Sequence, residues 1–397
     1  MNSNQLSLRR LCKVGLGFIL FAILNVTAPR PALSVSFTSV DVPFDGILSG
    51  DGSTIAGQLL SGAPFIWDAE NGITGLSGFV GAGEVRRISS DGSRLVGFTD
   101  RTDPSENEVF TWSATEGTRI VRRIPDTVPN LGHLLDVSLD GSTVIGVHIP
   151  PDTSRRVFIW DLQENRIDDL FDQIGETGHL FGHRLSEDGS ILAARTSQGT
   201  LLWNTTNRAT DPAMPTRIPG MIGPSRDLSA DGSTFVSSAI FATGFPGTPN
   251  IIFAEATIWT ADTGLTGLPS LEGGAVPPLR TDGTFMRTVV VSDDGSTVAG
   301  SSVRVNGPGE DTAFVWDSEH GTQALKLRLA MLGIDLDGWQ LTEVVDISAD
   351  GRTLFGNGTN PEGVRVSFLA VIPEPGTATL IALGLLSLAI RPRQALR

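Results

Sequence analysis

The sequence predicts a seven-bladed β-propeller, an all-β fold of four-stranded sheets arranged around an axis. A segment of the form aliphatic-Ser-x-Asp-Gly occurs seven times, and successive Asp-Gly pairs are 40 to 63 residues apart. Short stretches in which apolar and polar residues alternate flank these segments, as expected for half-buried strands. Repeats of this length, with turn residues at fixed places, are typical of propeller blades.

Each repeat unit predicts four strands, A to D in chain order. Strand A ends at the aliphatic-Ser step, and strand B follows the Asp-Gly pair, for which we expect a two-residue type I′ hairpin turn. Strand C contains an aromatic step, and strand D follows a further turn, as in GITGL at residues 72–76. The Asp-Gly pairs begin at Asp51, Asp91, Asp140, Asp188, Asp231, Asp294 and Asp350, and the strand C tryptophans are Trp67, Trp112, Trp160, Trp203, Trp259 and Trp316. Only residues 325–332 of the repeat region suggest a helix.

The seventh unit differs from the other six. It has Phe368 in the aromatic position of strand C but Ala370 where the tryptophan is expected, and it runs directly into Pro373 without a fourth strand. Residues 36–40, ahead of the first unit, supply a spare strand. We therefore predict that this strand completes the seventh blade, because joining the two ends removes an open sheet edge.

The repeated pattern ISxDGSxVVG followed by AFxWD resembles the HAF-type extracellular repeat of bacteria. The resemblance covers residues 35–372 and recurs seven times. It implies a secreted propeller of unassigned activity, and it carries no catalytic residues over to this chain.

The N-terminus predicts a secretory signal peptide over residues 1–34. Arg9, Arg10 and Lys13 are followed by the 11 apolar residues 14–24 and then by a segment containing Pro and Ala. Such a run is too short to span a bilayer core of about 30 Å. Small residues at the −3 and −1 positions predict cleavage between Ser34 and Val35. The chain's single cysteine lies in this segment, so the mature chain has no disulfide and no cysteine nucleophile.

The C-terminal segment, residues 373–397, has three parts. Pro373, Glu374 and Pro375 are followed by the apolar run 378–390, for which we expect a short transmembrane helix, and then by Arg391, Arg393 and Arg397. This order resembles the PEP-CTERM sorting tail of Gram-negative bacteria. The resemblance implies recognition by an exosortase-type sorting enzyme, a location at the cell envelope, cell surface or extracellular matrix, and an association with exopolysaccharide. A plain membrane anchor oriented by its arginines is the alternative.

Net charge disfavours nucleic acid as a partner. Residues 35–372 contain 22 basic and 43 acidic residues, a net charge of −21. A surface of this sign repels phosphate backbones. It also keeps an exported protein soluble.

No motif predicts a catalytic, metal or cofactor site. The acidic residues around Gly338 do not match an EF-hand, because Gly333 and Val344 occupy its first and last ligand positions. His179 and His183 have a spacing that two metal ligands can adopt on one strand face, but no further histidine cluster supports them. There is no G-x-S-x-G sequence and no phosphate-binding loop. We therefore expect no cofactor.

A charge pattern marks the innermost strands. The residues two positions before the repeat serines are Ile47, Arg87, Asp136, Arg184, Asp227, Val290 and Asp346. Equivalent positions lie side by side around a propeller axis, so the alternating charges predict inter-blade ion pairs. A ligand-binding tunnel is the alternative interpretation.

The loops predict a binding face. The A–B turns are short and alike, whereas the B–C and D–A connections, which emerge together on the opposite face, vary greatly in length. The longest, residues 238–255, contains Phe241, Phe245 and Phe253 and is the candidate binding loop. Packing of this loop over its own blade is the alternative.

Together these features predict an exported, non-catalytic binding or scaffold protein, with polysaccharide as one candidate ligand. Two alternatives stay open at this point: a propeller enzyme acting on extracellular glycans, and a structural protein held in the membrane by its C-terminal helix.

Overall fold

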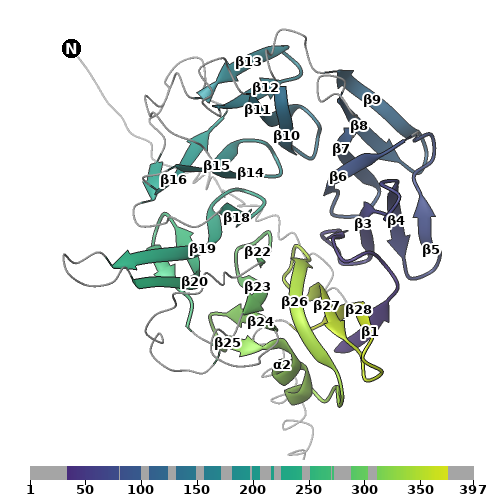
Figure 1. Cartoon of the computed structure of the whole chain (residues 1–397), viewed down its shortest axis with the longest axis vertical. Helices are drawn as coiled ribbons and strands as arrows, with labels where there is room; N and C mark the ends of the chain where they lie inside the picture. Colours follow the sequence, from purple (N-terminus) through teal and green to yellow (C-terminus); the bar gives the residue numbers. More distant parts are fainter. Residues whose placement is uncertain are drawn as a thin grey trace, which may run out of the picture. The chain divides into compact units, whose positions relative to one another are not determined.

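The computed structural model describes residues 34–79, 81–99, 107–123, 131–148, 156–170, 181–196, 199–205, 216–218, 225–243, 251–269, 271, 288–302 and 311–373. The chain divides into two compact units, Met1–Ala32 and Leu33–Arg397, and every described residue belongs to the second. The described strands of this unit form seven four-stranded antiparallel sheets. The sheets stand side by side around an axis (Figure 1), which confirms the predicted seven-bladed propeller.

Each blade runs from an inner strand A to an outer strand D. Blade 1 consists of β2 (Ile47–Leu48), β3 (Thr54–Gln58), β4 (Pro64–Asp68) and β5 (Gly72–Gly75). Blade 2 consists of β6 (Gly83–Ile88), β7 (Arg94–Thr99), β8 (Glu108–Ser113) and β9 (Gly117–Arg123). Blade 3 consists of β10 (Leu131–Val137), β11 (Thr143–His148), β12 (Arg156–Asp161) and β13 (Arg166–Asp169). Blade 4 consists of β14 (Phe181–Leu185), β15 (Ile191–Thr196), β16 (Gly199–Asn204) and β17 (Thr216–Ile218).

The remaining blades follow the same order, and the last includes the first strand of the chain. Blade 5 consists of β18 (Ser225–Leu228), β19 (Thr234–Thr243), β20 (Ile251–Thr260) and β21 (Gly264–Gly267). Blade 6 consists of β22 (Val289–Val291), β23 (Thr297–Ser302), β24 (Thr312–Asp317) and β25 (Gly321–Ala324). Blade 7 consists of β26 (Gln340–Ile347), β27 (Thr353–Thr359), β28 (Arg365–Val371) and β1 (Ser36–Val40).

The two ends of the propeller meet in blade 7. β1 pairs antiparallel with β28, from Ser36 opposite Val371 to Val40 opposite Ser367, which confirms the predicted closure (Figure 1). The ring of Phe37 on β1 lies 4.9 Å from the ring of Trp339 in an edge-on arrangement. Aromatic packing therefore reinforces the backbone ladder that closes the ring.

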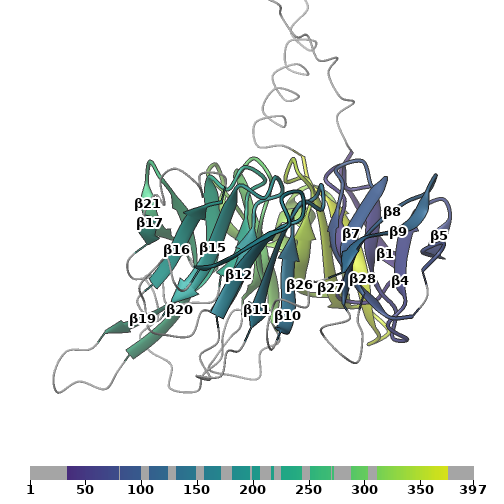
Figure 2. The same ribbon diagram turned by 90° about the horizontal axis from the view of Figure 1, so that it is seen from above.

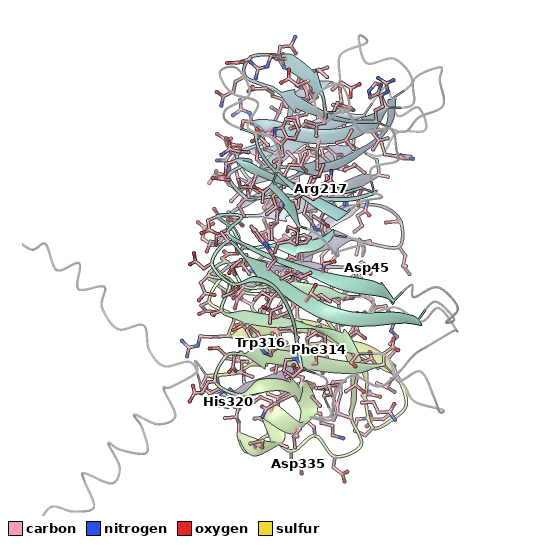
Figure 3. All side chains as sticks on the ribbon, turned by 90° about the vertical axis from the view of Figure 1, so that its left-hand side faces the viewer. Asp45, Arg217, Phe314, Trp316, His320 and Asp335 are labelled. Atoms are coloured by element: carbon pink, nitrogen blue, oxygen red, sulfur yellow. The ribbon has the colours of Figure 1, made fainter. Side chains whose placement is uncertain are left out.

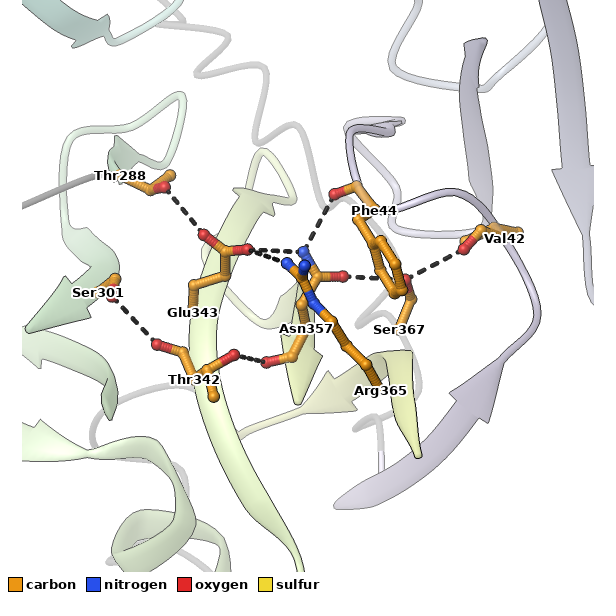
Figure 4. Close-up of polar contacts among 9 residues, drawn as sticks. All are labelled: Val42, Phe44, Thr288, Ser301, Thr342, Glu343, Asn357, Arg365 and Ser367. Atoms are coloured by element: carbon orange, nitrogen blue, oxygen red, sulfur yellow. Dashed lines mark hydrogen bonds and ion pairs between the residues drawn. The ribbon is translucent and has the colours of Figure 1, made fainter. Parts of the chain in front are cut away.

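A polar network reinforces the same junction (Figure 4). The fully buried side-chain amide of Asn357 donates to the carbonyl of Phe44 (3.1 Å) and to Oε1 of Glu343 (2.8 Å), and its oxygen accepts from the hydroxyl of Ser367 (2.9 Å). Phe44 belongs to the segment that leads from blade 7 into blade 1, so these bonds join the first and last parts of the propeller. Every polar atom of the Asn357 side chain is paired, which burial requires.

The seven A–B turns are wider than predicted. In the first, Ser49 N donates to Thr54 O (2.8 Å), which leaves four residues in the loop, and only Gly52 has a positive φ, of 74°. The predicted type I′ turn, which needs two positive-φ residues, is therefore wrong. Hydrogen bonds from the Ser49 hydroxyl to Asp51 Oδ1 (2.7 Å) and from Thr54 N to the Ser49 oxygen (3.0 Å) hold the wider loop. The other six turns have the same serine–aspartate bond.

Apolar side chains fill the space between adjacent blades. Phe314 on β24, for example, which is labelled in Figure 3, is 1% exposed. It packs in a cluster that contains Val236 of blade 5. The tryptophans of strand C lie on β4, β8, β12, β16, β20 and β24. In blade 7, Ala370 is fully buried at the equivalent place.

The predicted helix is α2 (Leu325–Met331), which lies in the connection from blade 6 to blade 7. Its buried residues Leu325 and Leu329 pack in one cluster with Val315 of blade 6 and Leu341 of blade 7. No helix within the described residues is both long and apolar enough to cross a membrane. Residues 378–390, the expected transmembrane helix, lie outside those residues.

Candidate functional site

Charged side chains of the inner strands converge near the axis. Arg87 of blade 2 forms an ion pair with Asp136 of blade 3, with Nη2 and Oδ2 2.7 Å apart, and Asp136 is 1% exposed. Arg87 also donates to the carbonyls of Val137 (3.2 Å) and of Leu185 in blade 4. One guanidinium therefore joins three consecutive blades.

Three aspartates bind the backbone of the blade that follows them. In each case a carboxylate oxygen accepts the N–H of a strand A residue in the next blade. The bonds are Leu185 N to Asp136 Oδ2 (3.0 Å), Val291 N to Asp227 Oδ2 (3.0 Å) and Leu48 N to Asp346 Oδ2 (2.7 Å). They connect blade 3 to 4, blade 5 to 6 and blade 7 to 1. The inner carboxylates therefore satisfy inter-blade N–H groups as well as arginines.

Burial raises the pKa of two of these aspartates, Asp346 and Asp227. It raises the pKa of Asp346 to about 7, although N–H donors from Leu48 and Ile347 favour the ionised form. It also raises the pKa of Asp227, against the positive charge of Arg184, which has the opposite effect. The positive charge of Arg184, on β14 of blade 4, thus opposes the rise in pKa of both Asp227 in blade 5 and Asp346 in blade 7.

Sequence reasoning missed two further axial acids, Glu187 and Asp293. Both occupy the position between Ser and Asp in the repeat, which holds Gly50, Ser90, Leu139 and Ala230 in other blades. Burial, and next the negative charge of Glu187, raises the pKa of Asp293 to about 7. Burial likewise raises the pKa of Glu187. Two acids at a position otherwise filled by small or neutral residues were the available signal.

Backbone groups at that same position join neighbouring blades. Leu139 N donates to Glu187 O (2.8 Å), and Glu187 N donates in turn to Ala230 O (3.3 Å). Further bonds of this kind run from Asp51 N to Ser90 O (2.7 Å) and from Ala349 N to Gly50 O (2.8 Å). Backbone hydrogen bonds between adjacent blades therefore lie beside the charged side chains near the axis.

The two faces of the propeller are built differently. We call the face with the seven A–B turns the turn face, and the face with the B–C and D–A connections the loop face. Ser36 pairs with Val371, and Val371 pairs with Thr353, the first residue after an A–B turn, so both ends of the propeller lie at the turn face. The predicted cleavage residues Ser34 and Val35 and the first sorting residue, Pro373, therefore border the turn face.

The structure corrects the candidate binding loop. Much of residues 238–255 is not loop: β19 and β20 are ten-residue strands paired from Thr234 opposite Thr260 to Thr243 opposite Ile251. Phe241 and Phe253 are register partners in this hairpin, and Phe245 lies outside the described residues. Figure 2 shows β19 and β20 extending beyond the other strands. The polar–apolar alternation expected of a strand is weak here, because most of the segment is apolar, and a loop was predicted instead.

Other predicted positions lie outside the described residues: His179 of the histidine pair, and Glu374, Pro375, Arg391 and Arg393 of the sorting signal. Within the part of the chain that the structure describes, no three His, Cys, Asp or Glu side chains are grouped so that they could hold a metal ion.

Comparison with known proteins shows the fold alone. No family model and no curated protein matches the sequence. An oligogalacturonate lyase in complex with manganese is similar in structure, with a TM-score of 0.53, 14% identity, and coverage of 86% of this chain and 97% of the other. The oligogalacturonate lyase from Vibrio parahaemolyticus has a TM-score of 0.52 and 14% identity, and the match covers 86% of this chain and 98% of the lyase. The propeller domain of the trilobed protease from Pyrococcus furiosus, which has an open velcro topology, has a TM-score of 0.51 and 10% identity, and covers 85% and 95%.

Proposed function

We propose that this protein is an exported, non-catalytic propeller that binds an extracellular partner through its loop face. Residues 1–34 serve as the signal peptide, and residues 373–397 serve as a PEP-CTERM tail for an exosortase-type enzyme. The mature protein then resides at the envelope, the cell surface or in the extracellular matrix of a Gram-negative bacterium.

The observation that carries this proposal is the placement of the chain ends. Val371 and Ser36 are paired at the turn face, next to Pro373. A tail that begins there holds the turn face toward its attachment point and leaves the loop face free. The loop face also has the most varied connections, and binding residues are usually found on such loops.

The charges near the axis support a binding role over catalysis. Asp136 accepts bonds from Arg87 and Leu185, and Asp227 and Asp346 bind N–H groups of the blades that follow them. Acids and bases that hold blades together in this way are occupied in the folded protein. A structural role accounts for each of these contacts without a substrate.

Binding of the mature chain to extracellular matrix and to a glycan array tests the proposal. We expect matrix association by the parent protein and loss of that association when Gly-Ser replaces residues 239–255, joining Ser238 to Ala256 by a short turn. An equal melting temperature controls for folding. Turnover of a glycan, abolished by changing Asp293 or Glu187 alone, would contradict the non-catalytic assignment.

A further inference from the structure

A two-stranded arm extends from blade 5 at the loop face. We define the arm as residues 239–243 of β19 and 251–255 of β20, which pair from Ala239 opposite Glu255 to Thr243 opposite Ile251. The neighbouring strands β18 and β21 do not reach the arm. The pair of β18 and β19 nearest to the arm is Ser225 with Ser237, and that of β20 and β21 is Thr257 with Gly267. Among the described residues, therefore, no third strand covers either edge of the arm (Figure 2).

The composition of the arm does not suit an isolated ribbon in water. Eight of its ten residues are apolar and only Glu255 is charged. A hairpin of two strands is at best marginally stable without a third strand or a packed face. Exposed strand edges, moreover, are templates for pairing with another chain. Both edges of the arm are therefore open to pairing as far as the described residues extend.

The backbone identifies the more suitable edge. The carbonyl of Ala256 accepts from Leu268 N (2.8 Å), on the side of β20 away from β19. Because backbone groups alternate in direction along an antiparallel strand, those of Ala254 and Ile252 face the same outer side. β20 contributes Ile251, Ile252 and Phe253 to the arm, and β-branched and aromatic residues favour strand pairing.

We propose that the outer edge of β20 in the arm pairs antiparallel with the same edge of a second copy of this chain, forming a four-stranded sheet across a two-fold axis. An antiparallel pair of identical strands is self-complementary, as two-fold symmetry requires. Pairing centred on Phe253 sets Glu255 opposite Ile251 of the second copy, so the two carboxylates stay apart. The outward backbone N–H and C=O groups of Ile252 and Ala254 then gain hydrogen-bond partners on the second copy.

The distribution of charge favours the arm over the rest of the surface as the contact between two copies, and it makes that contact sensitive to salt. Residues 35–372 carry a net charge of −21, so two copies repel each other over most of their surfaces. The arm has one carboxylate and lies at the edge of the molecule. Each paired edge is only about 17 Å long for five residues, so the contact is small and the association weak. Added salt screens the repulsion and strengthens association, whereas it would weaken a contact made by ion pairs.

Sedimentation velocity of residues 34–373, which contain every strand of the seven sheets, tests the proposal. We expect a concentration-dependent monomer–dimer equilibrium that shifts toward dimer between about 0.05 and 0.5 M salt, a range over which the Debye length falls to about a third. Ala254→Pro removes an outward N–H and leaves the bonds within the arm, so it should raise the dimer dissociation constant at least about tenfold. Ala242→Pro, at the outer edge of β19, is the matched control and should not change it.

A monomer at every concentration would overturn self-association and leave ligand binding by the loop face untouched. Dimers that persist in Ala254→Pro, or that are lost in Ala242→Pro alone, would overturn the assignment of the edge. Melting curves of both variants check that the propeller remains folded.

Discussion

Paired positions on strands B and C are matched in size in six of the seven blades. In five blades a glycine on strand B lies opposite a phenylalanine on strand C, as for Gly146 opposite Phe158. Blade 4 has Ala194 opposite Leu201, a larger residue facing a smaller one. The glycines leave space for the aromatic rings, because a Cβ on Gly146 would lie 2.4 Å from Cζ of Phe158. The close packing between blades thus depends on matched residue pairs.

Replacing one member of such a pair should destabilise the fold. We expect Gly146→Ala to lower the free energy of unfolding by about 1–3 kcal/mol, because the added methyl group overpacks the core against Phe158. The double variant Gly146→Ala with Phe158→Leu copies the blade 4 pair and should recover part of that loss. Gly75→Ala is the control, since a Cβ there has no atom within 4 Å. Urea unfolding measures all four proteins; equal effects of Gly146→Ala and Gly75→Ala would refute the size match.

The inter-blade carboxylates make a second test at this scale. Asp136→Ala removes the acceptor of both Arg87 and Leu185 N and leaves a buried charge without its partner. We expect a loss of about 3–5 kcal/mol in the free energy of unfolding. Glu116→Ala, which breaks an exposed ion pair with Arg119, should cost less than about 1 kcal/mol. Similar losses in the two variants would mean that the axial ion pair contributes no more than a surface one.

At the scale of the elements, strand β1 joins the two ends of the propeller. It supplies the outer strand of blade 7 and places Phe37 against both Trp339 and Phe368. The segment that follows it carries Phe44, whose carbonyl binds Asn357. The circular arrangement is therefore completed by residues from both ends of the propeller.

Loss of this closure should be visible in thermal unfolding. We expect Phe37→Ala to cost about 2–4 kcal/mol, because the partly buried ring leaves a cavity beside two aromatic neighbours. Deletion of residues 35–41 should lower the melting temperature further, since it also opens the edge of β28. Differential scanning calorimetry provides the comparison, and a melting temperature unaffected by the deletion would contradict closure by β1.

The repeat made much of this architecture predictable. Ser-x-Asp-Gly marks each A–B turn, and the missing fourth strand after Phe368 pointed to residues 36–40 as its replacement. The turn conformation was not predictable, because it depends on a hydrogen bond from the Ser49 hydroxyl to Asp51 that competes with a tighter turn. The charge of Glu187 raises the pKa of Asp293 because their blades bring the two side chains close together near the axis. The spacing of the repeats in the sequence does not define which blades lie close enough for this. The extended β19–β20 hairpin lacks alternation, so its sequence is equally compatible with a loop.

For the whole molecule, two groups of carboxylates give stability opposite dependences on pH. Hydrogen bonds from serines in the A–B turns lower the pKa of Asp91 to about 2. Burial alone would raise the pKa of Asp140, but hydrogen bonds from Ser138 and Ser142 outweigh it and lower that pKa. Such groups stabilise the fold above their unfolded pKa, near 4, and lose this contribution as the pH falls through their folded pKa. Asp293 and Asp346 have raised pKa values of about 7, so their contribution is complete below about pH 4 and is lost as the pH rises through 7.

We therefore expect the melting temperature to be highest near about pH 4, and to fall both as the pH rises from about 4 to 7 and toward about pH 2. Asp293→Asn should raise the melting temperature at about pH 8 and flatten the decline between about pH 4 and 7, because it removes a charge close to Glu187 and Asp227. At about pH 4 the same variant should differ little from the parent. A decline between about pH 4 and 7 that is unchanged in Asp293→Asn would show that this carboxyl is not responsible.

The proposed division into an attached turn face and a free loop face is tested most directly by labelling of two single-cysteine variants on intact cells. Residues 34–373 contain no cysteine. Leu60 is fully exposed in the B–C turn of blade 1, and Glu70 is exposed in the C–D turn, at the turn face. With a bulky, membrane-impermeant maleimide, we predict that Leu60→Cys reacts much faster than Glu70→Cys on cells, while both react at similar rates in purified residues 34–373. Equal rates on cells, or faster reaction at position 70, would contradict presentation of the loop face.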